Sequence, residues 1–316
     1  MIRPARLALL AAVAAAGLAA ADRPVTGPRA ALWTTPSARL AALSEEPGSC
    51  LSPTSDPQRA RSIAVGAAAF RAPLLLGGQA ARSGLSCNAC HRGGHDNPAF
   101  AYPGLSGAPG TADVTSSLFS SHRGDGQFNP RPIPNLSGDK ALLKVDQSLA
   151  SVALENFING LIHEEFDGPP APPAVLAGLA DYVRALSPGA CTAPRVIGLT
   201  GALAHVDAAL DNAEWLARSG DGPAARLLVS AARSELGLID ERYHLPRLAK
   251  GASELRRASA ALGVIERRMA TDSAGALPEL RRWRAAAASW QRPLRAAEAR
   301  SLYNPRVLMR WLAAGA

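Results

Sequence analysis

Apolar residues recur at helical spacing in three stretches of the first half of the chain. The first stretch follows Asp56-Pro57, a pair suited to the start of a helix, because aspartate caps the first turn and proline tolerates its first position. Its apolar face comprises Ile63, Ala67 and Phe70. The stretch ends at Gly77-Gly78, so we predict helix between these two signals.

Two further stretches, residues 150–166 and 174–186, predict a pair of helices separated by a proline-rich break. The apolar face of the first holds Leu154, Phe157, Ile158 and Leu161, and that of the second holds Val175, Leu179, Tyr182, Val183 and Leu186. Residues 91–139 are rich in Gly, Pro, Ser and Asn and show no sustained periodicity. We therefore expect long loops before this helix pair.

From Arg195 onward the sequence is dominated by helix-forming residues with apolar positions at helical spacing. These positions include Leu199, Leu203, Val206, Leu210, Leu255, Leu262, Ile265, Met269, Leu280, Trp283, Ala287 and Trp290. Turn-forming residues interrupt the pattern at 219–223, 243–247, 271–278 and 304–305. The pattern predicts an up-and-down helical bundle, with the tryptophans in its core.

Length and charge also divide the chain into two parts. Its 316 residues suit two domains, and its net charge of +8 is unevenly spread. From Arg195 onward there are 19 Lys+Arg against 12 Asp+Glu, whereas Asp22 to Pro194 is close to neutral. The tail's arginines are interleaved with Ala, Leu and Glu and form no recognition motif, so we do not expect nucleic-acid binding. They form either solvated helix faces or a docking surface for an acidic partner.

The N-terminus predicts export. Residues 1–21 combine early arginines, an apolar run and small residues at Ala19 and Ala21, which is typical of a signal peptide cleaved after Ala21. An uncleaved anchor is the alternative, although the apolar run is short for a bilayer span. No other stretch is long and apolar enough to span a membrane, so we expect a periplasmic protein in which disulfides can form.

Cys87, Cys90 and His91 form a C-x-x-C-H motif. This is the attachment signature of c-type haem: both thiols bond to the haem vinyl groups, and the adjacent histidine is the proximal iron ligand. Asn88 and Ala89 need no particular identity in this interpretation. We therefore predict one covalent haem c, which would also give the long loops a group to wrap around.

Two other interpretations of the motif are weaker. A thioredoxin-like redox pair would be expected near a βαβ pattern, which the sequence lacks. A zinc site would need a second pair of ligands, whereas Cys50 and Cys191 each stand alone with no histidine nearby in the sequence.

The segment "VGAAAFRAPLLLGGQAARSGLSCNACH" resembles the region before the first haem of bacterial di-haem cytochrome c peroxidases. The segment "HRGDGQFNPRPIPNLSG" resembles that family's loop in which a histidine precedes an Arg-containing stretch, and "LENFINGLIHEEFDG" with "VLAGLADYVRAL" is similar to its closing helix pair. The resemblance spans Ile63 to Leu186. It implies a cytochrome c-like haem domain with long loops at residues 22–194. Together with the helical bundle domain that the apolar pattern predicts at 195–316, it leads us to expect an all-α chain.

The chain departs from that family in having one C-x-x-C-H motif instead of two, and no Phe-Trp-Asp-Gly-Arg-like segment near which the family's catalytic glutamate lies. We therefore expect a mono-haem protein that transfers single electrons to a redox partner protein, such as another cytochrome. A peroxidase-like haem enzyme is the alternative, and a haem-binding sensor or structural role is a third. For the tail, the sequence suggests partner docking or homodimer formation.

The sixth iron ligand is not a methionine of the first part, because Met269 and Met309 both lie in the tail. His122 loosely matches the position of the peroxidases' distal histidine and is our candidate, with an open five-coordinate iron as the alternative. Arg131 is either a partner for a haem propionate or an ordinary surface arginine.

Cys50 and Cys191 flank the predicted haem part in Gly/Pro-containing turns. An even pair of cysteines left over in an exported protein usually forms a disulfide, so we predict a Cys50–Cys191 bond. Two unrelated thiols are the alternative. Such a bond would place the domain boundary near Thr192.

Overall fold

The computed structural model describes residues 27–315, and the fold of this part is mostly helical, as the sequence predicts. The predicted signal peptide, residues 1–21, lies outside the described residues. No described helix is both long enough and apolar enough to cross a membrane.

The first part contains short helical turns, two longer helices and three two-residue strands, and a fourth such strand opens the second part. Its helices are α2 (Arg39–Ser44), α3 (Pro57–Ala69), α4 (Pro73–Leu76), α5 (Gly78–Ser83), α6 (Cys87–Cys90), α7 (Ala153–Gly160) and α8 (Pro173–Ala185). The 3-10 turns are η1 (Arg29–Trp33), η2 (Pro36–Ala38), η3 (Arg92–Gly94), η4 (Lys140–Leu142) and η6 (Pro188–Ala190), and η5 (Leu161–Glu165) is a π-helical turn. Strand β1 (Glu45–Glu46) pairs antiparallel with β4 (Arg195–Val196), as does β2 (Thr111–Ala112) with β3 (Arg131–Pro132).

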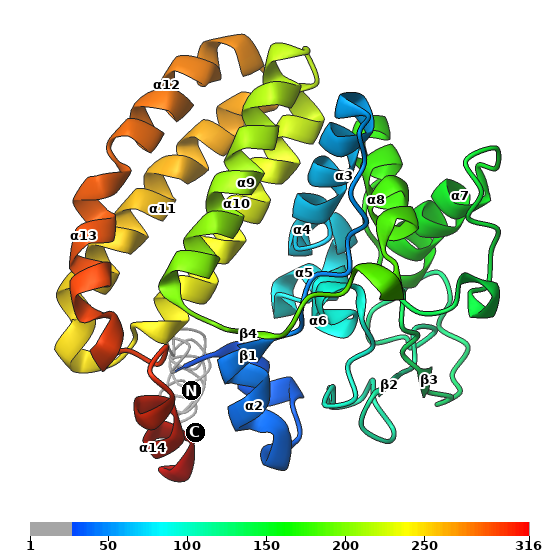
Figure 1. Cartoon of the computed structure of the whole chain (residues 1–316), viewed down its shortest axis with the longest axis horizontal. Coiled ribbons are helices and arrows are strands. Elements are labelled where there is room, and N and C mark those ends of the chain that lie inside the picture. Colours follow the sequence, from blue (N-terminus) through cyan, green and yellow to red (C-terminus); the bar gives the residue numbers. More distant parts are fainter. Residues whose placement is uncertain (1–26, 316) are drawn as a thin grey trace, which may run out of the picture.

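Helices α3 and α8 cross at very close range, and their contact is the most extensive one between helices of the first part (Figure 1). Asp56 caps α3 by accepting a hydrogen bond from Gln58 N, as its sequence predicts. A Cβ atom on Gly66 would lie 1.9 Å from the carbonyl oxygen of Gly178, so only glycine permits this approach. One turn further along, Phe70 of α3 packs on Tyr182 of α8 with ring centroids 5.0 Å apart.

The second part is a bundle of long helices, as predicted. It comprises α9 (Leu199–Arg218), α10 (Gly222–Arg242), the 3-10 turn η7 (Pro246–Leu248), α11 (Ala249–Met269), α12 (Ser273–Ala285), α13 (Ala287–Ala297), the 3-10 turn η8 (Glu298–Arg300) and α14 (Pro305–Ala313). Helices α9 to α12 each pack on the next, and α12 returns to α9 (Figure 1). Trp283 of α12 and Trp290 of α13 lie with ring centroids 5.7 Å apart and ring planes tilted by 42°. They therefore meet across the break between two helices instead of sharing the face of one.

The predicted break at 271–278 is shorter in the structure. Helix α12 already begins at Ser273, because the Asp272 side chain caps it by accepting a hydrogen bond from Gly275 N. Pro278 lies inside α12 rather than in a turn. A break that the sequence did not indicate separates α12 from α13 at Ala286.

The two parts share one continuous buried cluster, which runs from Trp33 to Tyr303. Helix α3 packs on α9 and α10, so the bundle lies directly against the α3–α8 pair (Figure 1). Ionic contacts cross the same boundary. Arg71, at the end of α3, pairs with Glu46 of β1 and lies 3.6 Å from Glu235 of α10. His205 of α9 lies 3.6 Å from Glu46.

The early and late segments of the described chain also meet. Leu43 of α2 packs in a small separate cluster with residues of the C-terminal segment: Leu302, Val307 and Leu308. The buried guanidinium of Arg242 donates to the carbonyl oxygens of both Leu43 and Leu302, at 2.9 and 3.1 Å. Figure 1 shows α2 and α14 side by side at the end of the molecule where β1 and β4 pair.

Candidate functional site

The C-x-x-C-H motif lies on α6, a single helical turn placed against the end of α3. Asn88 N donates a hydrogen bond to the Phe70 carbonyl at 3.0 Å, which ties the motif to the α3–α8 crossing. Asn88 is not the neutral spacer that the sequence suggested. Its side-chain oxygen accepts a hydrogen bond from Gly93 N at 2.9 Å and so fixes the chain just after the motif. Asn97 adds a second tie by donating to the Ala89 carbonyl at 2.9 Å.

Cys87 and Cys90 are half-buried free thiols, not joined to each other. Burial raises the pKa of each thiol to about 12, and for Cys90 the neighbouring Cys87 adds to the effect. Both thiols are therefore protonated at neutral pH. A thioredoxin-like pair works through a thiol whose pKa is lowered, so this environment is the opposite of the one that such a pair requires.

His91 presents one ring nitrogen to the protein and leaves the other available. Its Nδ1 lies 3.0 Å from the carbonyl oxygen of Pro134. A carbonyl can only accept, so Nδ1 carries the proton and Nε2 keeps its lone pair. Burial lowers the pKa of His91 to about 4, although the bond to Pro134 acts in the other direction. The ring is thus neutral and in the tautomer that binds a metal through Nε2.

The thiols and the imidazole do not surround a common point. Within residues 27–315, the group whose ligand atoms converge within 4.8 Å of one another is Cys50, His95 and Cys191, and it includes no residue of the C-x-x-C-H motif. A zinc ion bonded directly to Cys87, Cys90 and His91 would need such convergence. Haem does not, because the thiols bond to its periphery and the histidine to its central iron. The arrangement therefore fits haem better than a single metal ion.

His122, the candidate distal ligand, lies in an exposed loop. Its Nε2 is 3.8 Å from a carboxylate oxygen of Asp167, and its ring lies 4.8 Å from that of His163. Asp167 also accepts hydrogen bonds from the backbone N–H and the hydroxyl of Ser121. These contacts hold the His122 loop against the segment after η5. A role for His122 on the iron stays a prediction.

Arg131, the candidate propionate partner, lies on β3 and is exposed. Strand β3 leads directly to Pro134, and Ile133 N donates to the Gly110 carbonyl at 2.9 Å. The strand pair β2–β3 thus supports the carbonyl that orients His91. The propionate contact of Arg131 stays a prediction.

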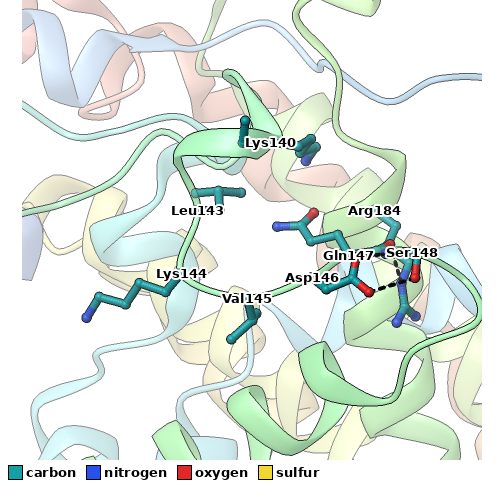
Figure 2. A pocket seen from close by; sticks show the side chains of 9 residues that line it. Lys140, Leu143, Lys144, Val145, Asp146, Gln147, Ser148 and Arg184 are labelled. Carbon is teal, nitrogen blue, oxygen red and sulfur yellow. Dashed lines mark hydrogen bonds between the residues drawn. The ribbon is translucent and has the colours of Figure 1, made fainter.

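A cavity of about 550 Å³ lies inside the loop of residues 140–148, next to Arg184 of α8. Figure 2 shows the amide of Gln147 pointing into the space inside this loop and the side chain of Lys144 pointing away from it. Arg184 is already paired with Glu155, at 2.7 Å, and donates to the Gln147 carbonyl. Since none of Cys87, Cys90 and His91 lines this cavity, we do not assign it to the cofactor.

Cys50 and Cys191 are joined in a disulfide, which confirms that prediction. The structure adds a residue that the sequence did not connect with them: Nε2 of His95 lies 3.2 Å from Cys50 Sγ. His95 is four residues beyond His91 but 45 residues from Cys50, so no spacing in the sequence could have revealed the contact.

Comparison with protein-family models, with curated proteins and with solved structures finds no match to this chain. The resemblance of residues 63–186 to the di-haem peroxidases therefore rests on the motifs themselves.

Proposed function

We propose that the protein is an exported mono-haem c-type cytochrome of the periplasm that transfers single electrons. The observation that carries the proposal is the geometry of the motif: two cysteines that are not bonded to each other lie on one helical turn, and the next residue is a histidine whose Nδ1 lies 3.0 Å from the Pro134 carbonyl. Cys87 and Cys90 would hold the cofactor covalently, and His91 would bind its iron through Nε2. When bound, haem supplies a reversible one-electron couple.

The chain's own residues hold and orient this site. The Pro134 carbonyl fixes the plane and the tautomer of His91, and Asn88 and Asn97 fix the turn that carries the thiols. Phe70 lies beside His91, with ring centroids 6.5 Å apart, so the His91 ring also contacts the residue that ends α3. A rigidly held site of this kind suits electron transfer, because little has to move when the charge changes.

The covalent link can be tested by producing the protein together with a haem-attachment system. A denaturing gel stained for haem should show a coloured band for the wild-type protein. The Cys87→Ala/Cys90→Ala variant should lose the band. His163→Ala, which changes an exposed histidine outside the motif, should keep it. A colourless wild-type band would overturn the proposal.

Absorption spectra of the oxidised and reduced protein, with and without peroxide, separate a carrier from an enzyme. We expect one-electron reduction and stoichiometric reoxidation by an acceptor cytochrome, with no catalytic turnover of peroxide. Sustained peroxide consumption would favour the peroxidase-like alternative instead.

A further inference from the structure

The Cys50–Cys191 disulfide lies between two backbone hydrogen bonds. On one side Ser187 N donates to the Cys50 carbonyl at 2.8 Å, and on the other Thr192 N donates to the Ser49 carbonyl at 2.9 Å. These bonds are independent of the sulfurs. The two cysteines would therefore stay adjacent if the S–S bond were reduced, and the disulfide could form again without a rearrangement of the backbone.

The two sulfurs differ in access. Cys50 is completely buried, whereas Cys191 is exposed at the end of η6. In thiol–disulfide exchange a thiolate attacks one sulfur along the S–S axis and the other sulfur leaves. Here an external thiol can reach only Cys191, which makes Cys50 the leaving group.

A buried leaving thiolate is unfavourable unless a donor faces it. His95 fills this role. Its Nε2 lies 3.2 Å from Cys50 Sγ and 3.1 Å from the Gly48 carbonyl. Since that carbonyl can only accept, Nε2 carries a proton and donates it to Gly48. Cys50 Sγ lies close enough to the same N–H to share it once the sulfur is a thiolate. Its Nδ1 lies 3.4 Å from the hydroxyl of Ser137, which holds the ring in place.

We propose that Cys50–Cys191 is a redox-active pair that exchanges with an external dithiol at Cys191, with His95 as the positioning residue that stabilises the Cys50 thiolate. One thiolate of the dithiol attacks Cys191 Sγ, the S–S bond breaks, and its electron pair goes to Cys50 Sγ. The second thiol of the dithiol then attacks the dithiol sulfur that is bonded to Cys191, and Cys191 Sγ leaves as a thiolate. The protein gains two electrons and two protons, the latter from solvent, and the dithiol leaves as a disulfide.

The proposal does not depend on haem. Peptide mapping distinguishes the two pairs of cysteines, because Cys87 and Cys90 lie on a different peptide from Cys50 and from Cys191. The folded protein is treated with glutathione, quenched with iodoacetamide and mapped by mass spectrometry. We expect glutathione on Cys191 and the alkyl group on Cys50. Glutathione on Cys50, or no reaction until denaturant is added, would overturn the proposal.

The role of His95 is tested by the rate of reduction with dithiothreitol. His95→Phe keeps a ring but removes the donor, and it should slow reduction by about tenfold, since hydrogen bonds to charged groups are among the stronger ones. His95→Gln restores an N–H donor and should recover most of the rate. Equal rates for all three proteins would contradict the role of His95. If His95→Phe fails to fold, the position of the glutathione adduct on the wild-type protein still decides whether Cys191 is the attacked sulfur.

Discussion

The loop region at residues 91–152 and the helical bundle at residues 199–297 achieve their order by different means. The bundle buries apolar side chains at regular intervals, among them Leu210, Leu228, Leu255 and Leu280, all fully buried. The loop region buries fewer apolar side chains, chiefly Phe100, Leu105 and Phe119, and leaves Phe128 and Leu142 exposed by 62% and 83%. It relies on single hydrogen bonds between distant segments, such as Ser137 N to the Gly94 carbonyl.

The difference shows how each region depends on its sequence. Bundle stability is spread over many apolar contacts, so the bundle tolerates volume-conserving apolar exchanges and follows from the pattern alone. The loop region is held in place by a few hydrogen bonds between distant segments and by the disulfide beside it. Losing one tie there should have local consequences, whereas losing one core leucine should weaken the whole bundle.

The disulfide is expected to give the largest effect. The double variant Cys50→Ser/Cys191→Ser frees a loop of 141 residues, which should lower the free energy of unfolding by about 5 kcal/mol on the chain-entropy model. Urea unfolding measures the loss. Limited proteolysis should then cut the loop region first and leave the bundle intact. A loss below about 1 kcal/mol, or first cuts in the bundle, would contradict the comparison.

A core leucine of the bundle should come next. Leu228→Ala removes a fully buried side chain of α10 and should destabilise the protein by about 2–5 kcal/mol. Leu142→Ala, in the exposed loop, is the matched control and should change stability by no more than about 0.5 kcal/mol. Comparable losses of stability for both variants would show that Leu142 contributes as much packing as a buried leucine of the bundle.

The α3–α8 crossing should show an intermediate effect. In Gly66→Ala the new methyl group meets the Gly178 carbonyl, so the helices must separate at a cost of about 1–3 kcal/mol. Gly201→Ala in α9, where nothing lies within 4 Å, should be neutral or stabilise by up to about 1 kcal/mol. Thermal denaturation of the two variants distinguishes a steric cost from a general effect of replacing glycine.

The ionic contact between the two parts should give the smallest effect, and one that depends on pH. Burial raises the pKa of Glu46, but the contacts with His205 and Arg71 outweigh it and hold this pKa far below the ordinary value of 4.5. Its contribution to stability is therefore complete above about pH 4.5 and is lost as the pH falls toward the folded-state pKa.

The variant Glu46→Gln should cost about 1–2 kcal/mol at pH 7, since it removes a charged hydrogen-bond acceptor. Urea midpoints at pH 7 and pH 3 provide the measurement. The gap between wild type and variant should narrow at pH 3. A gap that widens at low pH would mean that Glu46 gains no stabilisation from its partners.

Periodicity was sufficient to predict that α3, α7, α8 and the bundle are helical. It overestimated the first helix, because α3 ends at Ala69 and Pro73 starts the separate α4. It also overestimated the buried face of α7, where Leu154 is buried but Phe157 and Ile158 are only half-buried. It also misled at Pro278, where the Asp272 cap lets the helix start before the proline. The C-x-x-C-H motif was found from residue types and spacing, and the disulfide pair from the two cysteines left over.

The supporting contacts could not be predicted in this way. Pro134 is 43 residues from His91, and its carbonyl would orient the ring whatever its side chain. His95 and Cys50 meet only because the loop after the motif folds back toward the turn before α3. Such contacts depend on tertiary structure, which leaves no local pattern in the sequence.

The small cluster of α2 and α14 has a consequence for the order in which the molecule can assemble. Leu43 is made early, whereas its apolar partners Leu302 and Leu308 are made after the whole bundle. Contacts between such distant positions form slowly, because a long stretch of chain must be ordered before they are gained. The guanidinium of Arg242, which bonds to the carbonyls of both segments, also waits for the later one. We therefore expect this end of the molecule to be completed late in folding, with Leu43 exposed until its partners have formed.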